Sequence, residues 1–335
     1  GKFKKGLDPA KEWWFENHPG CNCDNSGNVL TDNQPGTGDE RLIRTHYNPF
    51  VQFQFSYYQA MIGNFLPGEY AKKCGELAVR AWRYALRKGD DDRTLFLSTR
   101  LLAASELHCM DPDIVSEEEV MELTRRLLER QNRDEEGISG FFEELDKEGF
   151  RSFAFSTFPP KAILAVYKLF SNKPVAEELK ASLEAYIGEY LVADAGSNPF
   201  SLVPYGVFHK PENPEHQTFR DGGRGKYLRT FIHPFNSQEI MHPTNSVFMA
   251  HARLLKECSD LFTRKDWLTL AEKQVEWAMG HNTTGLSLFT GIGHRHPVPY
   301  SSVHVKVPHA ALAGYIGTPE DVPYLETSNW IEWST

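Results

Sequence analysis

The sequence predicts an all-helical fold. Two observations indicate this. Apolar residues recur at spacings of three and four through most of the 335 residues, and no convincing run alternates apolar with polar residues as a half-buried β-strand does. Many amphipathic helices joined by loops of uneven length are typical of paired helices packed around a common core. We therefore expect one domain over residues 1–335.

The first fifty residues are punctuated by glycine, proline and asparagine and predict a long loop. From Pro49 onward one helical pattern follows another. The expected helices span residues 50–62, 70–85, 94–108, 116–128, 158–170, 175–190, 248–261 and 267–279. Gly89 closes the second, and Ser116 with Glu119 forms a capping box at the start of the fourth.

Composition excludes several classes of protein. The net charge of −9 argues against nucleic acid or an anionic membrane as partner, because both bind basic surfaces. No run approaches the eighteen apolar residues of a membrane span, and residues 1–14 lack the apolar core of a signal peptide. We expect neutral or mildly cationic ligands.

The strongest functional signal is the stretch from Trp277 to Tyr300, WAMGHNTTGLSLFTGIGHRHPVPY. A patterned helix ends at Gly280, and a loop rich in glycine and histidine follows. His294, Arg295 and His296 provide hydrogen-bond donors and proton carriers in this loop. A loop that only connects two elements fits the spacing equally well.

The run GHNTTGLSLFTGIG within this stretch resembles glycoside hydrolase family 9, a family of inverting cellulases. TDNQPGTGD at residues 31–39, Asn245-Ser246 at the start of a helix, and GTPEDVPYLETSNW at residues 317–330 support the resemblance. It implies an (α/α)6 barrel, in which twelve helices form an inner and an outer ring. Because we count about eight helices and find no Asp-Ala-Gly-Asp motif before Thr31, we expect an incomplete barrel without its early hairpins.

The resemblance also implies the site residues. Glu332 is the carboxyl group nearest the family's general acid, although aligning Asn329 and Trp330 with the family pattern puts the acid position on Ser334. The predicted saccharide contacts are His294, Arg295, His296, Tyr300 and Trp330, with Tyr205 and Arg224 from the polar loop at residues 201–235. The arginines of that loop are alternatively expected to pair with the protein's own carboxylates.

Two other features have structural alternatives. Asp194-Ala195-Gly196-Ser197 matches three letters of the family motif, but we interpret it as a turn leaving a helix. His18, Cys21 and Cys23 bring soft ligands close together and suit a structural zinc site, with His46 as a guessed fourth ligand; a simple turn is the alternative. No organic cofactor is required, and a bound calcium or zinc ion would be structural.

The expected function is hydrolysis of a β-linked glucan or related plant polysaccharide with inversion, by a secreted or periplasmic enzyme whose oligomeric state the sequence does not fix. The loop at residues 294–301 departs from the family's His-Pro-His-His-Arg cluster, which favours a substrate other than plain cellulose. The alternatives are a noncatalytic carbohydrate-binding partial domain and a uronic-acid polysaccharide lyase, for which Tyr227 and His233 would form the catalytic pair.

Overall fold

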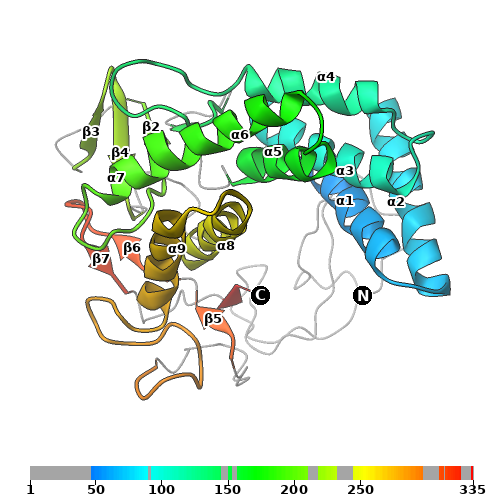
Figure 1. The fold of residues 1–335 in the computed structure, drawn as a ribbon. Coiled ribbons are helices and arrows are strands. Elements are labelled where there is room, and N and C mark those ends of the chain that lie inside the picture. The colour runs from blue at the N-terminus through cyan, green and yellow to red at the C-terminus, as the bar shows by residue number, and fades with distance from the viewer. Residues whose placement is uncertain are drawn as a thin grey trace, which may run out of the picture.

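The computed structural model describes residues 47–89, 92–144, 150–152, 157–209, 218–231, 244–296, 309–312, 314–325 and 333–334. Its helices are α1 (Pro49–Phe65), α2 (Glu69–Lys88), α3 (Thr94–Met110), α4 (Glu117–Leu128), α5 (Phe158–Leu169), α6 (Val175–Ala185), α7 (Ala193–Ala195), α8 (Thr244–Phe262) and α9 (Lys265–Ala278). A π-helix, η1 (Tyr186–Val192), joins α6 to α7. The eight helices expected from the sequence are confirmed, and so is the mostly helical fold (Figure 1).

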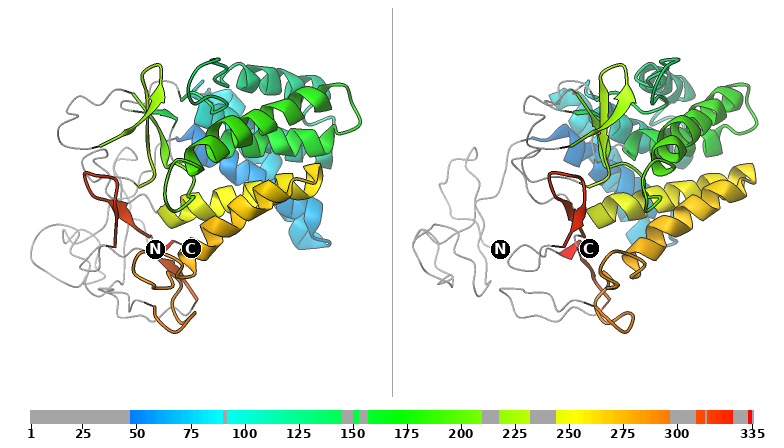
Figure 2. Two further views of the ribbon diagram at one scale, coloured as in Figure 1. Left: turned by 60° about the vertical axis from the view of Figure 1, so that its left-hand side comes forward. Right: turned by 90° about the vertical axis from the view of Figure 1, so that its left-hand side faces the viewer.

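The helices form successive antiparallel pairs, α1–α2, α3–α4, α5–α6 and α8–α9 (Figures 1 and 2). Across the pairs, α1 packs on α3, α3 on α5, and α5 on α8. Ser116 caps α4 as predicted, since the amide of Glu119 donates to Oγ of Ser116 at 3.1 Å, while the Glu119 carboxylate pairs with Arg100. One continuous apolar core runs through these pairs, as expected when each helix buries a stripe against its neighbours.

Short strands accompany the helices. They are β1 (Phe150–Ser152), β2 (Gly206–Phe208), β3 (Arg220–Gly223), β4 (Lys226–Arg229), β5 (Ala311–Leu312), β6 (Ile316–Gly317), β7 (Pro323–Tyr324) and β8 (Trp333–Ser334). The first four form an antiparallel sheet in the order β1-β2-β4-β3, with Val207 opposite Leu228. The sequence did not predict this sheet, because strands of three or four residues are too short to show alternation. It lies at one end of the helices, beside α7 (Figure 1).

The π-helix and α8 meet at a buried histidine. His251, 1% exposed, has Nδ1 at 2.9 Å from the carbonyl of Val247 and Nε2 at 3.0 Å from the hydroxyl of Tyr186. If Nδ1 donates to the carbonyl, Nε2 accepts from the tyrosine, and the ring is neutral. Burial lowers the pKa of His251 from 6.5 to about 4.

This histidine predicts a loss of stability in mild acid. Between pH 6.5 and about 4 the unfolded chain binds a proton at His251 that the folded protein does not, so the free energy of unfolding falls as the pH falls. The difference of 2.5 pKa units (6.5 minus 4), at about 1.36 kcal/mol each, corresponds to about 3 kcal/mol. Urea unfolding at pH 7 and pH 4.5 measures it. The pH dependence should shrink in His251→Leu and persist in His281→Leu, whose side chain is exposed; equal slopes in both variants would contradict the assignment.

Candidate functional site

The floor of the candidate site is the end of α9. Trp277, 2% exposed, packs its ring against Phe200, Phe231 and Tyr315, with centroid separations of 5.0, 5.6 and 5.1 Å. Gly280 then turns the chain at a φ of 115°, a conformation that residues with a Cβ rarely adopt. The predicted end of this helix at a glycine is therefore confirmed.

The amide of Asn282 fixes the loop that follows. Its Nδ2 donates to the carbonyls of Trp277 and Leu286, both at 2.8 Å. Its Oδ1 accepts from the Tyr315 hydroxyl at 2.9 Å and from the Thr284 hydroxyl at 3.0 Å. Burial raises the pKa of Tyr315, so its hydroxyl stays protonated and available as a donor. The loop is thus held from inside by neutral hydrogen bonds.

The loop continues into a small β-structure that reaches the C-terminal segment. The amide of Leu312 donates to the carbonyl of Leu288 at 2.8 Å, and the amide of Thr290 donates to the carbonyl of Ala310 at 3.0 Å. On its other side β5 pairs with β8, placing Leu312 opposite Trp333. Residues 288–290, 311–312 and 333–334 therefore lie side by side at this end of α8 and α9 (Figure 1).

Three of the predicted saccharide contacts belong to the same loop. His294, Arg295 and His296 all have exposed side chains. The carbonyl of Arg295 accepts from the amide of Ser287 at 2.8 Å, which ties this stretch back to the start of the loop. A Cβ added at Gly285 would lie 3.7 Å from Nη1 of Arg295, so the guanidinium group folds over that glycine. The predicted contacts Tyr300 and Trp330 and the candidate acid Glu332 lie outside the described residues, as do the candidate metal ligands His18, Cys21 and Cys23.

Tyr205 and Arg224 do not join this loop. Tyr205 is fully buried with Phe208 and Val247 in a second apolar cluster, so it leaves no ring face for a ligand and acts in packing. Arg224 lies in the turn between β3 and β4, where its Nε is 2.9 Å from the exposed carboxylate of Glu136. The sequence suggested a ligand role for both because the loop that carries them is rich in aromatic and basic residues, a composition that buried and surface turns share.

A buried ion network joins β3 and β4 to their surroundings, in line with the alternative expectation that the arginines of residues 201–235 pair with the protein's own carboxylates. Arg220 donates to both carboxylate oxygens of Asp194, at 2.8 and 2.9 Å from Nη2 and 3.1 Å from Nε, and its Nη1 is 2.7 Å from Asp321. Asp321 also accepts from the amides of Thr230 and Phe231, each at 2.9 Å. Asp194 is 1% exposed, and burial raises the pKa of its carboxyl while Arg220 opposes the rise.

This network is suited to holding strands in place. Each of its carboxylates is bonded to an arginine, and each connects elements far apart in the sequence: α7 to β3, and β3 and β4 to the β6–β7 hairpin. The prediction that Asp194-Ala195-Gly196-Ser197 leaves a helix is confirmed, since α7 ends at Ala195. The Asp194 side chain turns inward to the network.

Metal and membrane features can be judged only over part of the chain. In the described ranges, no three His, Cys, Asp or Glu side chains come together as metal ligands. None of the helices in those ranges is long and apolar enough to cross a membrane.

Comparison with known proteins identifies the fold. No family model and no curated protein matches the sequence. Among solved structures, the chain is similar to the GH family 9 endoglucanase J30, with 19% identity, a TM-score of 0.54, and coverage of 84% of this chain and 47% of that one. It is similar to a Bacteroides ovatus GH9 protein, with 14% identity, a TM-score of 0.55, and coverage of 88% and 51%.

A third similar structure is AaCel9A in complex with cellobiose-like isofagomine, with 14% identity, a TM-score of 0.53, and coverage of 85% and 49%. The chain thus spans about half the length of these three proteins. At such low identity the likeness concerns the fold. The helical pairs described above therefore have the (α/α)6 barrel fold of these solved structures, which is the fold class that the sequence predicted.

Proposed function

We propose that this chain is the saccharide-binding and general-acid portion of a glycoside hydrolase that cleaves a β-linked glucan or related plant polysaccharide with inversion. The observation that supports it best is the pairing of β8 with β5, and of β5 with the loop at residues 288–290. That pairing brings Trp333, the residue after Glu332, and the loop leading to His294 to the same end of α8 and α9. Two of the similar solved structures contain cellobiose-like isofagomine and cellobiose.

The proposed roles follow from an inverting mechanism. One carboxylic acid protonates the leaving oxygen while a carboxylate on the opposite face of the sugar activates water. Glu332 is the proposed acid. In the alternative alignment, the family's acid position falls on Ser334. His294, Arg295 and His296 would bind sugar hydroxyls, and Tyr300 and Trp330 would give aromatic contacts. Because Arg220 occupies both oxygens of Asp194, we do not assign the water-activating base to Asp194.

The scaffold needs no organic cofactor for this reaction, and we propose only a structural role for any calcium or zinc ion, with His18, Cys21 and Cys23 as candidate ligands. A polysaccharide substrate would place the activity outside the cytoplasm, in the periplasm or after secretion. The lyase alternative is less favoured, because it needs arginines to neutralise a uronate. Arg220 and Arg229 are bonded to Asp321 and Arg224 to Glu136.

A noncatalytic saccharide-binding domain is the second candidate. It is favoured by the ion network, because Asp194 and Asp321 are bonded to arginines there and neither carboxylate is available to activate water. Both the hydrolase and the noncatalytic domain would bind saccharide through the loop that carries His294, Arg295 and His296. They differ only in whether the bound saccharide is cleaved. Binding and hydrolysis therefore have to be measured separately.

The test combines isothermal titration with cello-oligosaccharides and NMR of the anomer released from a polysaccharide panel. His294→Ala should weaken binding about tenfold, the effect of losing about 1.4 kcal/mol of hydrogen bonding. His281→Ala is the matched control, since that histidine is exposed and paired with Glu276 at the far end of the loop. Glu332→Gln should leave binding intact and stop hydrolysis.

The outcomes separate the candidates. An inverted anomer supports hydrolysis, an unsaturated product indicates a lyase, and binding without turnover indicates the noncatalytic domain. Absence of binding to every saccharide in the panel would remove the proposal.

A further inference from the structure

One face of α1 carries an unusual stripe of exposed apolar side chains. Its members follow one another at spacings of four, three, four and three, and all but the half-buried Ile62 are exposed: Val51, Phe55, Tyr58, Ile62 and Phe65. Val51, Phe55, Tyr58 and Phe65 are 57%, 43%, 41% and 84% exposed. Spacing of this kind places the side chains along one side of a helix, and it is the pattern by which a helix packs against another helix. A contiguous exposed apolar stripe on a folded protein marks an interaction surface.

The stripe lies on the side of α1 opposite its contacts with α2 and α3. On its other side α1 meets α3, where Phe50 contacts the ring of Phe96 and Nδ2 of Asn64 donates to the Glu106 carbonyl at 2.9 Å. Against α2, the Ser56 hydroxyl donates to the carbonyl of Ala78 at 2.9 Å. The α1–α2 pair is the first of the four described pairs, and α1 packs on α3 of the next pair (Figure 1).

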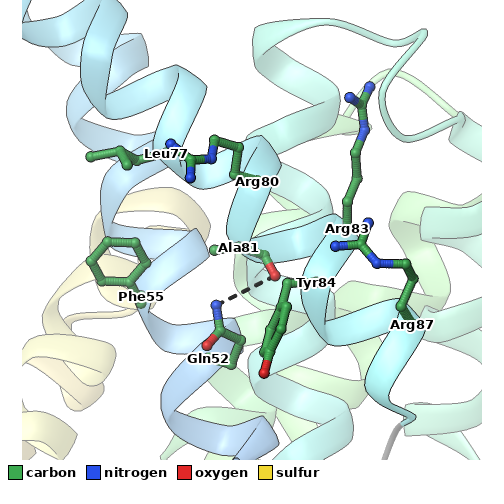
Figure 3. Close-up of a pocket in the computed structure, with 8 residues that line it drawn as sticks. All are labelled: Gln52, Phe55, Leu77, Arg80, Ala81, Arg83, Tyr84 and Arg87. Atoms are coloured by element: carbon green, nitrogen blue, oxygen red, sulfur yellow. Dashed lines mark hydrogen bonds between the residues drawn. The ribbon is translucent and has the colours of Figure 1, made fainter.

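Beside the stripe, α2 contributes three arginines. Arg80, Arg83 and Arg87 line an open surface pocket of about 360 Å³ together with Phe55 and Tyr84. Gln52 also lines it, and its amide donates to the Ala81 carbonyl (Figure 3). None of the three guanidinium groups forms an ion pair with a described residue, although the chain as a whole carries 45 acidic and 36 basic residues. On α4 the comparable exposed Arg125 pairs with both Glu122 and Glu129.

We propose that this α1–α2 face, made of the α1 stripe and the three α2 arginines, docks an acidic amphipathic helix from outside these 335 residues. The apolar side of that helix would lie on Phe55 and its neighbours, and its carboxylates would bond Arg80, Arg83 and Arg87 bidentately. A second copy of the same face is disfavoured, because it would bring two sets of arginines together.

The test uses two synthetic three-heptad helices of identical apolar spacing, one with glutamate and one with lysine at the flanking positions. Each is labelled and titrated with the full 335-residue chain by fluorescence anisotropy. We expect the glutamate helix to bind at least tenfold more tightly, with an affinity that falls as salt is raised. Arg83→Glu should reverse the preference, whereas Arg125→Glu on α4 should not. Circular dichroism checks that both variants keep their helices.

Several results would overturn the proposal. Equal affinity for both peptides, or a preference unchanged by Arg83→Glu, would show that the arginines do not select the partner. A dimer in light scattering that Phe55→Glu dissociates would identify a second copy as the occupant. Binding that appears only after residues 1–46 are removed would identify that segment instead. Saccharide binding should be unaffected by Arg83→Glu, so failure here is distinguishable from failure of the proposed function.

Discussion

Arg220→Met is expected to lower the free energy of unfolding by about 3–5 kcal/mol, the usual result of removing one partner from a buried ion pair. The substitution keeps an unbranched apolar stem but leaves Asp194, 1% exposed, without its cation. It also removes the 2.7 Å contact with Asp321 that connects β3 to the β6–β7 hairpin. Urea unfolding at neutral pH, followed by circular dichroism, measures the loss.

Arg224→Met is the matched control, since Arg224 forms a single ion pair with Glu136 in which both side chains are more than half exposed. Exposed pairs of this kind contribute about 0–1 kcal/mol. Acidification gives a second check on the cause. Burial already raises the pKa of Asp194, and without Arg220 the neutral carboxyl is favoured further, so the deficit should narrow as the pH falls. Similar losses in both variants would mean that the buried network contributes no more than a surface pair.

The second large effect concerns Trp277, whose replacement by alanine should cost about 3–5 kcal/mol. The indole ring fills the space between Phe200, Phe231 and Tyr315, and these neighbours belong to separate segments that cannot close over a cavity. The cavity would also remove packing from Tyr315, whose hydroxyl donates to the Asn282 amide oxygen. Because Asn282 fixes the loop that carries His294, saccharide binding should weaken along with the stability. Chemical unfolding and the cello-oligosaccharide titration measure the two effects.

Two further substitutions give this prediction its controls. Trp277→Phe should cost less than Trp277→Ala, because it keeps an aromatic ring and removes an indole N–H that has no hydrogen-bond partner among the described residues. Val275→Ala, on the same helix but 42% exposed, should change the free energy of unfolding by less than about 0.5 kcal/mol. If Trp277→Ala were as mild as Val275→Ala, the ring would not support the site.

The helices were predictable because their signals are local. Gly89 follows α2, and Ser116 caps α4, each within a few residues of the pattern that it ends or begins. The interruption by η1 was not predictable, since residues 175–190 have an uninterrupted helical pattern that an extra residue in one turn does not disturb. The β1–β2 pairing was missed for a different reason. It joins Ser152 to Val207, a separation over which short strands leave no trace in the sequence.

The site was predictable only where it is continuous in the chain. The loop from Gly280 to His296 could be recognised from its glycines and histidines. The grouping of Asp194, Arg220 and Asp321 could not, because it depends on three elements meeting in space. Tyr205 shows the opposite failure, since its aromatic character fitted sugar binding equally well until its complete burial was known.

The π-helix η1 has a consequence for the orientation of everything after it. Each residue of an α-helix advances the side-chain direction by about 100°, so the one extra residue accommodated in a π-turn rotates the rest of the helix by about that angle. Asp194 lies two residues after the end of η1, and this rotation directs its side chain toward Arg220. Gly188 of η1 is suited to deletion, because no described atom lies within 4 Å of where its Cβ would stand. Deleting it would restore α-helical phasing and turn the Asp194 carboxylate away from Arg220. The ion network therefore depends on a one-residue offset in helical phase.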